Sequence, residues 1–438
     1  MKNTKMSRRG FVGGSVAALT GLGLSRGTRL FGQETGTNAN DLKVKQYRTL
    51  GRTGFKCSDI GFGSSGVTDP ALISAILDAG VNYVDCAEGY VRGQVEKTIG
   101  EAMKNRDRKK VFLTTKLGLR EDDTKQSVLE RANKCLGRLQ SEYIDCLMIH
   151  MPSTVAALDN KAYHAAIKDL KTEGKVRFSG LSNHGSQWGA VPETMEKVHL
   201  AAAEDGRFDV ALLVYNFIQS DMGENILKAY KKKNVGATLM KTNPVLNYVE
   251  RKVEIDKAEE EGRDIPPRTR ELVKRLKARA DQAESFKNKY NLTSFNEIRD
   301  AAIKFVLNNP DVNSVCPTIL NYSDLEAYVS LSGSKFDLKS QNTLAAYKTT
   351  YGEFYCRHAC GQCEPQCPHG VPVNTIMRYN HYFMGQGKEK AAMLEYASLP
   401  TNKADVCSNC EGHCEKACPY GVRVQGLLML AHQTLTLA

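Results

Sequence analysis

The sequence lacks several features that would assign it to a common class. The first expected strand is not followed by Gly-x-Gly-x-x-Gly, because Gly61-Phe62-Gly63 has neither the third glycine nor the acidic partner of that motif. No flavin-binding motif is visible either. Six positive charges precede the first acidic residue, Glu34. Only part of the net charge of +11 therefore belongs to the body of the chain, and this charge does not indicate a nucleic-acid site.

The N-terminus has no apolar run long enough to make a good membrane-spanning helix. Arg8-Arg9 instead precedes Phe11 and a stretch rich in glycine and alanine. This pattern is typical of a twin-arginine export signal, and a basic tail is the alternative. We expect a signal in residues 1–32, a linker in residues 33–45, and export to the periplasm or cell envelope. There is no clear small-x-small cleavage site, so an uncleaved signal would be the one link to a membrane.

Cysteine is concentrated at the other end, where eight of the 13 cysteines lie in the last 83 residues. They form two runs of four that each end in Cys-Pro. Such spacing lets consecutive thiolates bind one [4Fe-4S] cluster while the Cys-Pro member reaches the other cluster. We expect two clusters. Each run has one residue more than the usual bacterial ferredoxin spacing, so a single cluster is an alternative. Zinc sites or disulfides are further alternatives. The expected ligands are Cys356, Cys360, Cys363, Cys367, Cys407, Cys410, Cys414 and Cys418.

Between these ends, short apolar runs alternate with helical segments, which predicts α/β architecture with a parallel sheet. Eight such units in residues 46–335 suit a (β/α)8 barrel, whose usual size is about 250 residues. A doubly wound open sheet is the alternative. The expected strands are residues 59–63, 81–85, 110–116, 143–150, 176–182, 210–215, 235–241 and 312–317.

A charged insertion in residues 246–290 interrupts the expected barrel. It is either a solvated helical hairpin or a cap over the face on which barrels carry their active sites. After the barrel, a helix from about Asn342 to Glu353 is expected to lead into a small α-helical iron-sulfur domain, so that residues 336–438 contain the connecting helix and that domain. Val371, Val373, Ile376 and Met377 recur at helical intervals and are expected to pack its core.

Polar residues fall at or just beyond the ends of three consecutive expected strands. They are Asp85, Tyr90, Lys116 and His150. Because barrel strands converge at one mouth, these side chains are expected to meet there. Lys116 would lower the pKa of the Tyr90 phenol, Asp85 would hold Lys116, and His150 would donate a hydrogen bond to a carbonyl oxygen. Together they predict a general acid that protonates a carbonyl as hydride arrives.

The region 46–335 resembles the aldo-keto reductase family. The similarity is carried by Leu50-Gly51-Arg52-Thr53-Gly54, by the run from Ala79 to Asp85 with Tyr90, by Thr115-Lys116, by Tyr143-Ile144-Asp145 through His150, and by Leu181-Ser182-Asn183. The resemblance implies that Asp85, Tyr90, Lys116 and His150 are the catalytic tetrad. It also implies that Ser64, Ser65, Ser182 and Asn183 contact a nicotinamide cofactor.

The resemblance also shows departures from the family pattern. Leu212 stands in the place of a glutamine, and Met240 in that of a tyrosine that stacks on nicotinamide. Residues 317–322 lack the arginine that holds the 2′-phosphate, so NAD and NADP both remain open. The cysteine tail is similar to the helical ferredoxin-type domain of an exported branch of this family.

We therefore expect an oxidoreductase that interconverts a small aldehyde or ketone, sugar-derived compounds included, with an alcohol. An electron-transfer subunit and a ligand-binding barrel without turnover are the alternatives. Because hydride carries two electrons and each cluster accepts one, the clusters would serve structure or a redox partner protein. The other cysteines, Cys57, Cys86, Cys135, Cys146 and Cys316, are expected in the core without a catalytic role.

Overall fold

The structure is a computed structural model that describes residues 42–186, 189–245, 259–262, 281 and 284–436. These residues belong to one compact unit that begins at Leu42. The expected signal and most of the charged insertion lie outside the described residues. Neither expectation is therefore tested by the structure.

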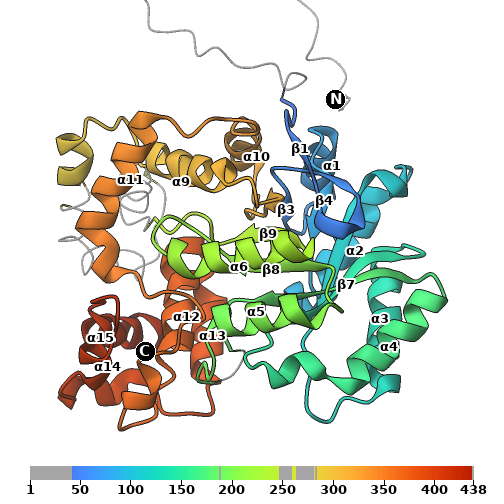
Figure 1. Cartoon of the computed structure of the whole chain (residues 1–438). Helices are drawn as coiled ribbons and strands as arrows, with labels where there is room; N and C mark the ends of the chain where they lie inside the picture. The colour runs from blue at the N-terminus through green and yellow to red at the C-terminus, as the bar shows by residue number, and fades with distance from the viewer. Residues whose placement is uncertain (1–41, 187–188, 246–258, 263–280, 282–283, 437–438) are drawn as a thin grey trace, which may run out of the picture. The chain divides into compact units, whose positions relative to one another are not determined.

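A closed parallel barrel forms the larger part of the described chain (Figure 1). Bridges from Ile60 to Val315 and from Gly63 to Thr318 join its first strand to its last. The (β/α)8 barrel is thus confirmed, and the open doubly wound sheet is excluded. All eight expected strands are present, with some ends shortened: β3 Phe62–Gly63, β4 Tyr83–Asp85, β5 Phe112–Leu117, β6 Ile144–His150, β7 Val176–Asn183, β8 Val210–Val214, β9 Gly236–Met240 and β10 Ser314–Val315.

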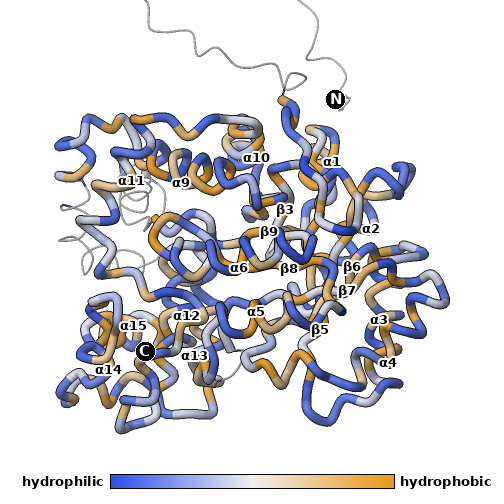
Figure 2. Tube along the Cα trace, in the orientation of Figure 1, coloured by the Kyte–Doolittle hydropathy of each residue, from blue (hydrophilic) through white to orange (hydrophobic). Residues whose placement is uncertain are grey.

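Amphipathic helices surround the barrel, and hydrophobic and hydrophilic segments alternate along them (Figure 2). Several begin at a polar side chain that caps a backbone N–H group. Asp69 caps the first helix, and Thr124 forms a reciprocal capping box with Ser127 on the third. The surrounding helices are α1 Pro70–Asp78, α2 Gln94–Met103, α3 Lys125–Leu139, α4 Lys161–Thr172, α5 Met195–Asp205, α6 Ser220–Lys233, α9 Asn296–Asn308 and α10 Tyr322–Val329.

An antiparallel hairpin of β1 (Tyr47–Thr49) and β2 (Lys56–Ser58) precedes the barrel and was not expected from the sequence. Strands of three residues are too short for an alternating pattern to reveal them. The turn between them places Leu50 in an interior cluster with Tyr83 and Phe112. Gly51 in this turn has a φ of +45°, and a Cβ there would lie 2.3 Å from the nitrogen of Gly236. Only glycine fits so close to β9.

Helices that follow the barrel build a second core. α11 (Leu338–Tyr351) includes most of the expected connecting helix and packs on α9. Four further helices then enclose the cysteine residues: α12 Val373–Gln386, α13 Glu389–Ala397, α14 His413–Lys416 and α15 Val424–Leu435. The expected packing residues Val371, Val373, Ile376 and Met377 are all buried in this core. Among the described helices, none has both the length and the apolar character to cross a membrane.

Buried hydrogen bonds join this helical segment to the barrel. The Gln219 side chain, at the start of α6, donates to His358 O at 2.8 Å and accepts from His358 N at 2.9 Å. Thr375 on α12 donates to Gly189 O at 2.6 Å. These barrel residues follow β7 and β8, at the carboxyl end of the sheet. The helical segment is therefore held against the barrel mouth.

Gln219→Ala should weaken this attachment, because it leaves both buried backbone groups of His358 without a partner. We expect unfolding free energy to fall by about 1–3 kcal/mol and hydrogen exchange at His358 to accelerate. Urea denaturation and exchange mass spectrometry measure the two effects. Gln126→Ala is the control, because its exposed side chain contacts only Glu130. Equal stabilities of the two variants would contradict the assigned attachment.

Candidate active site and cysteine pocket

The four polar residues expected at the barrel mouth come from three adjacent strands. Asp85 ends β4, Lys116 lies near the end of β5, and His150 ends β6. Tyr90 begins the short 3-10 turn Tyr90–Gly93 that follows β4. Because neighbouring strands are in register, their carboxyl ends bring these side chains together.

Lys116 and Asp85 form a buried ion pair. The Lys116 ammonium lies 2.6 Å from Asp85 Oδ1 and donates to Cys86 O at 2.6 Å. The Lys116 side chain has no solvent exposure. Burial opposes its charge, but the Asp85 carboxylate and the Tyr90 phenol outweigh this effect and raise the pKa of Lys116. Lys116 is therefore charged beside Tyr90 at neutral pH.

The Tyr90 ring lies close to this cation, with its centroid 5.2 Å from Lys116 Nζ. Burial raises the pKa of Tyr90 to about 12, although Lys116 acts in the opposite direction. The expectation of a lowered pKa is thus wrong in its net direction, because desolvation of the phenolate outweighs the field of the lysine. Tyr90 is protonated at neutral pH, which is the state required of a proton donor.

His150 faces the edge of the Tyr90 ring, with centroids 6.2 Å apart. Burial lowers the pKa of His150 to about 3, and the cations Lys116, Arg378 and Lys241 contribute to the same direction. The imidazole is therefore neutral near pH 7. A neutral imidazole can donate one hydrogen bond to a carbonyl oxygen without carrying a charge.

The residues expected near a nicotinamide have different surroundings. Ser64 donates its hydroxyl to Asp85 O at 2.6 Å, and Ser65 accepts from Lys388 Nζ at 2.9 Å. Asn183 accepts from the backbone of Gly185 at 3.0 Å. Ser182 is buried, and its hydroxyl has no partner among the described residues. An unpaired buried hydroxyl is suited to bind a polar group of a ligand.

The departures from the family pattern lie where the sequence places them. Leu212 on β8 is buried in the barrel interior and offers no amide group. Met240 is the last residue of β9 and is partly buried against the same interior cluster. The family glutamine and the stacking tyrosine are thus absent from this chain. The unpaired Ser182 hydroxyl is still suited to bind the carboxamide of a nicotinamide.

The structure adds residues to the mouth that the sequence analysis missed. Arg378 and Tyr382 lie on α12, and the Tyr382 hydroxyl is 3.4 Å from His184 Nδ1. Lys241 follows β9, with its ammonium 5.1 Å from the centre of the Tyr382 ring. Lys388 precedes α13 and reaches Ser65. The available signal was Arg378, the one arginine or lysine of α12, with Tyr382 four positions after it.

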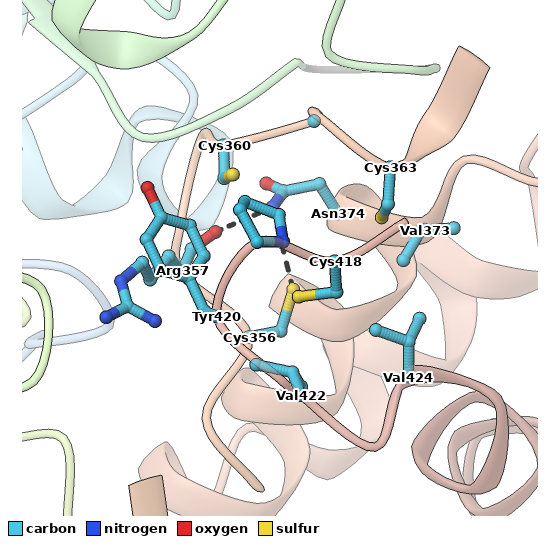
Figure 3. A pocket seen from close by; sticks show the side chains of 12 residues that line it. Cys356, Arg357, Cys360, Cys363, Val373, Asn374, Cys418, Tyr420, Val422 and Val424 are labelled. Carbon is cyan, nitrogen blue, oxygen red and sulfur yellow. Dashed lines mark hydrogen bonds between the residues drawn. The ribbon is translucent and has the colours of Figure 1, made fainter. Parts of the chain in front are cut away.

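Four cysteines line one pocket beside α12 (Figure 3). They are Cys356, Cys360 and Cys363 of the first run and Cys418 of the second. Burial and the three neighbouring thiols raise the pKa of Cys356 well above its ordinary value. The rest of the lining is largely apolar and includes Val373, Val422 and Val424.

The other four cysteines form a second group. Burial, then Cys414, Cys367 and Cys410, raise the pKa of Cys407 to about 12. Cys367 thus lies with the second run and Cys418 with the first, which is the exchange of ligands expected from the sequence. Iron binding itself stays a prediction. Within the described residues, no three His, Cys, Asp or Glu side chains converge closely enough to hold one metal ion.

The remaining five cysteines are buried in the barrel, as expected. Cys86 is the one beside the tetrad. Burial raises the pKa of its thiol to about 12, with Glu96 contributing to the same direction. A protonated thiol is a weak nucleophile, which agrees with a structural role.

Comparison with known proteins extends this picture. Residues 65–347 match the sequence profile described as "Aldo/keto reductase family". The chain is 27% identical over 214 residues to "Aldo-keto reductase YhdN" of Bacillus subtilis, which is 44% of this chain and 61% of that protein. It is 32% identical over 159 residues to the "NADH-specific methylglyoxal reductase" of Escherichia coli, covering 31% of this chain and 49% of that protein. The chain thus spans about half to three fifths of the length of these relatives.

Solved structures show a weaker similarity. An aldo-keto reductase from Klebsiella pneumoniae in complex with NADPH superposes with a TM-score of 0.49 and 16% identity, covering 72% of this chain and 99% of that one. The barrel assignment therefore depends on the strand order of this chain. The profile match covers more than half of the sequence and includes the strands that end near Asp85, Lys116 and His150. The protein belongs to the aldo/keto reductase family.

Proposed function

We propose that this protein reduces a small aldehyde or ketone to an alcohol and catalyses the reverse oxidation. The observation that carries the proposal is the position of Tyr90, whose ring centre lies 5.2 Å from the buried Lys116 ammonium and 6.2 Å from the ring centre of the neutral His150. Such a group can donate a proton to a carbonyl oxygen. The names of the relatives support this reaction class, since one of them is a methylglyoxal reductase.

The chain's own residues would act as follows. His150 donates a hydrogen bond that orients the carbonyl oxygen, and Tyr90 transfers its phenolic proton to that oxygen. Lys116 stabilises the phenolate that Tyr90 becomes, which offsets the cost of forming a charge in a buried site. Asp85 holds Lys116 in place and balances its charge. Water then returns a proton to Tyr90 after the alcohol leaves.

A nicotinamide, when bound, would supply the hydride that the carbonyl carbon accepts. Ser182 and Asn183 would hold its carboxamide, because the Ser182 hydroxyl is buried without a partner among the described residues. Ser65 lies at the same barrel mouth. The Ser64 hydroxyl instead donates a hydrogen bond to Asp85 O and so positions the end of β4. Residues 317–322 contain no basic side chain, which favours NAD, although NADP remains an alternative.

The cysteine segment is proposed to hold two [4Fe-4S] clusters, one for each group of four thiols. Zinc would need four ligands within about 2.3 Å of one point. The thiols of Figure 3 instead surround a cavity, as ligands of four separate irons would. Because the first run leads directly into α12, cluster binding would fix that helix at the barrel mouth. Electron transfer to a redox partner protein is a second role open to the clusters.

Export by the twin-arginine route to the periplasm or cell envelope is the corresponding proposal for residues 1–32. It is supported by Arg8-Arg9 before Phe11 in the sequence. The route carries folded proteins, which suits a chain that must receive clusters before it leaves the cytoplasm. An uncleaved signal would tether the protein to the membrane.

Tyr90→Phe should lower kcat for carbonyl reduction by about 100-fold or more, because it removes the proton donor. Nucleotide affinity should change little, since the hydroxyl acts mainly in the transition state. Steady-state kinetics and equilibrium titration measure the two quantities. Tyr47→Phe, at an exposed position of the β1–β2 hairpin, is the control. A Tyr90 variant with the kcat of the parent would exclude this mechanism.

Iron analysis tests both the clusters and their exchanged ligands. Anaerobically purified protein should contain about eight irons per chain. Cys360→Ser/Cys418→Ser alters one group of the structure and should retain about four irons, whereas Cys360→Ser/Cys367→Ser alters both and should retain few. Loss of all iron from the first double variant would instead place each cluster within one run. Cys135→Ala, in the barrel, should keep the full content.

Replacement of Arg8 and Arg9 by lysine should prevent export in a bacterial host, because the twin-arginine pathway reads the arginine pair. Immunoblots of periplasmic and cytoplasmic fractions measure the distribution. Arg26→Lys/Arg29→Lys makes the same substitution outside the pair, also without a change in charge, and should be exported like the parent. A parent protein found only in the cytoplasm would refute the export proposal.

A further inference from the structure

Three basic side chains from distant parts of the chain gather beside the catalytic residues. Arg378 on α12 donates to Ser186 O at 2.6 Å and to the Tyr382 hydroxyl at 3.3 Å. Lys388 donates to Ser65 at 2.9 Å. Lys241 lies 5.1 Å from the centre of the Tyr382 ring. We call Lys241, Arg378 and Lys388 the basic cluster.

The basic cluster lacks a matching number of acids. The oxygens that accept from Arg378 and Lys388 belong to Tyr382, Ser186 and Ser65 and carry no charge, and the buried Nε of Arg378 has no hydrogen-bond partner among the described residues. The acid that acts on all three is Glu395, and burial raises the pKa of its own carboxyl group. Arginine cannot lose its proton in a protein. A buried guanidinium with an unpaired N–H is costly unless an anion binds beside it.

Burial supports the same conclusion for the lysines. Burial, followed by the charges of Arg378 and Lys388, lowers the pKa of Lys241 well below its ordinary value. Burial also lowers the pKa of Lys388 to about 8. An anion bound beside them would raise both pKa values and thereby favour the charged form of each lysine.

The basic cluster lies next to the proton donor. Arg378 and Lys241 are close enough to His150 to lower its pKa. Tyr382, which contacts both, is 3.4 Å from His184, whose ring centre is 6.0 Å from that of His150. The ring centre of Tyr90 is 6.2 Å from that of His150. An anion bound by the cluster would therefore be a few atoms away from a carbonyl held by Tyr90 and His150.

We propose that the basic cluster binds an oxyanion, a carboxylate or a phosphate, carried by the same molecule as the reacting carbonyl. The substrate class is thus an anionic aldehyde or ketone. Arg378 forms the paired contact for which its planar guanidinium is suited, and Lys241 and Lys388 add charge. This inference is based on the proposed carbonyl reduction and adds that the C-terminal helices select the substrate.

The test compares pairs of aldehydes in which one member carries an anionic group and the other is neutral. Succinic semialdehyde is compared with pentanal, and glyceraldehyde 3-phosphate with glyceraldehyde, using the full iron-loaded chain. In the parent, kcat/KM should favour the anionic member of at least one pair. Arg378→Gln should raise KM for that anionic member by about tenfold or more and leave its neutral partner nearly unchanged. The pair that responds shows whether the cluster prefers carboxylate or phosphate.

Two further variants keep the result interpretable. Lys388→Gln alters a partly exposed residue and should show the same selective effect even if Arg378→Gln folds poorly. Arg299→Gln, on α9 and bonded to Asp300, should leave both members of each pair unaffected. Equal effects on anionic and neutral members, or no effect on either, would overturn the anion site while leaving carbonyl reduction intact. A change in nucleotide affinity alone would also overturn it, because the cluster would then bind cofactor phosphates.

A binding measurement separates this inference from the proposed function. If the parent reduces none of the four carbonyl compounds, calorimetric titration with citrate decides the matter without turnover. Citrate that binds the parent and not Arg378→Gln or Lys388→Gln would support the anion site and leave the reaction in doubt. Citrate that binds all three proteins equally, or none of them, would overturn the anion site.

Discussion

The buried ion pair between Lys116 and Asp85 is the interaction on which the barrel mouth depends. An ammonium without solvent exposure persists because a carboxylate lies 2.6 Å away and a backbone carbonyl accepts a second hydrogen bond. This pair connects β4 to β5 and places a fixed positive charge beside Tyr90. Burial keeps the phenol protonated, whereas the charge of Lys116 favours its ionised form.

The C-terminal helices complete the site rather than simply following the barrel. Gln219, Thr375 and Arg378 join them to loops that leave the barrel strands at their carboxyl ends. Because α12 then lies over these loops, its arginine and tyrosine enter the surroundings of His150. One cysteine run precedes this helix and the other follows it in the chain. The barrel mouth and the cysteine residues are thus connected through one helix.

The pKa of Tyr90 shows why sequence reasoning about a site can be correct in its residues and wrong in its electrostatics. Strand ends and residue types indicate that Lys116 and Tyr90 are neighbours, and they are. The degree of burial is not visible in the sequence, yet it dominates the pKa. The hairpin of β1 and β2 was missed for a related reason, since its strands are too short to produce a periodic pattern.

The sequence by itself determined the eight barrel strands, the four polar residues at their ends and the two cysteine runs, because each depends on local patterns of apolar, polar and thiol residues. Tertiary structure alone decided the rest. It closed the sheet through Ile60 and Val315 and placed Arg378 beside Lys241. These contacts join residues far apart along the chain, and no local pattern records which distant residue will be packed against them.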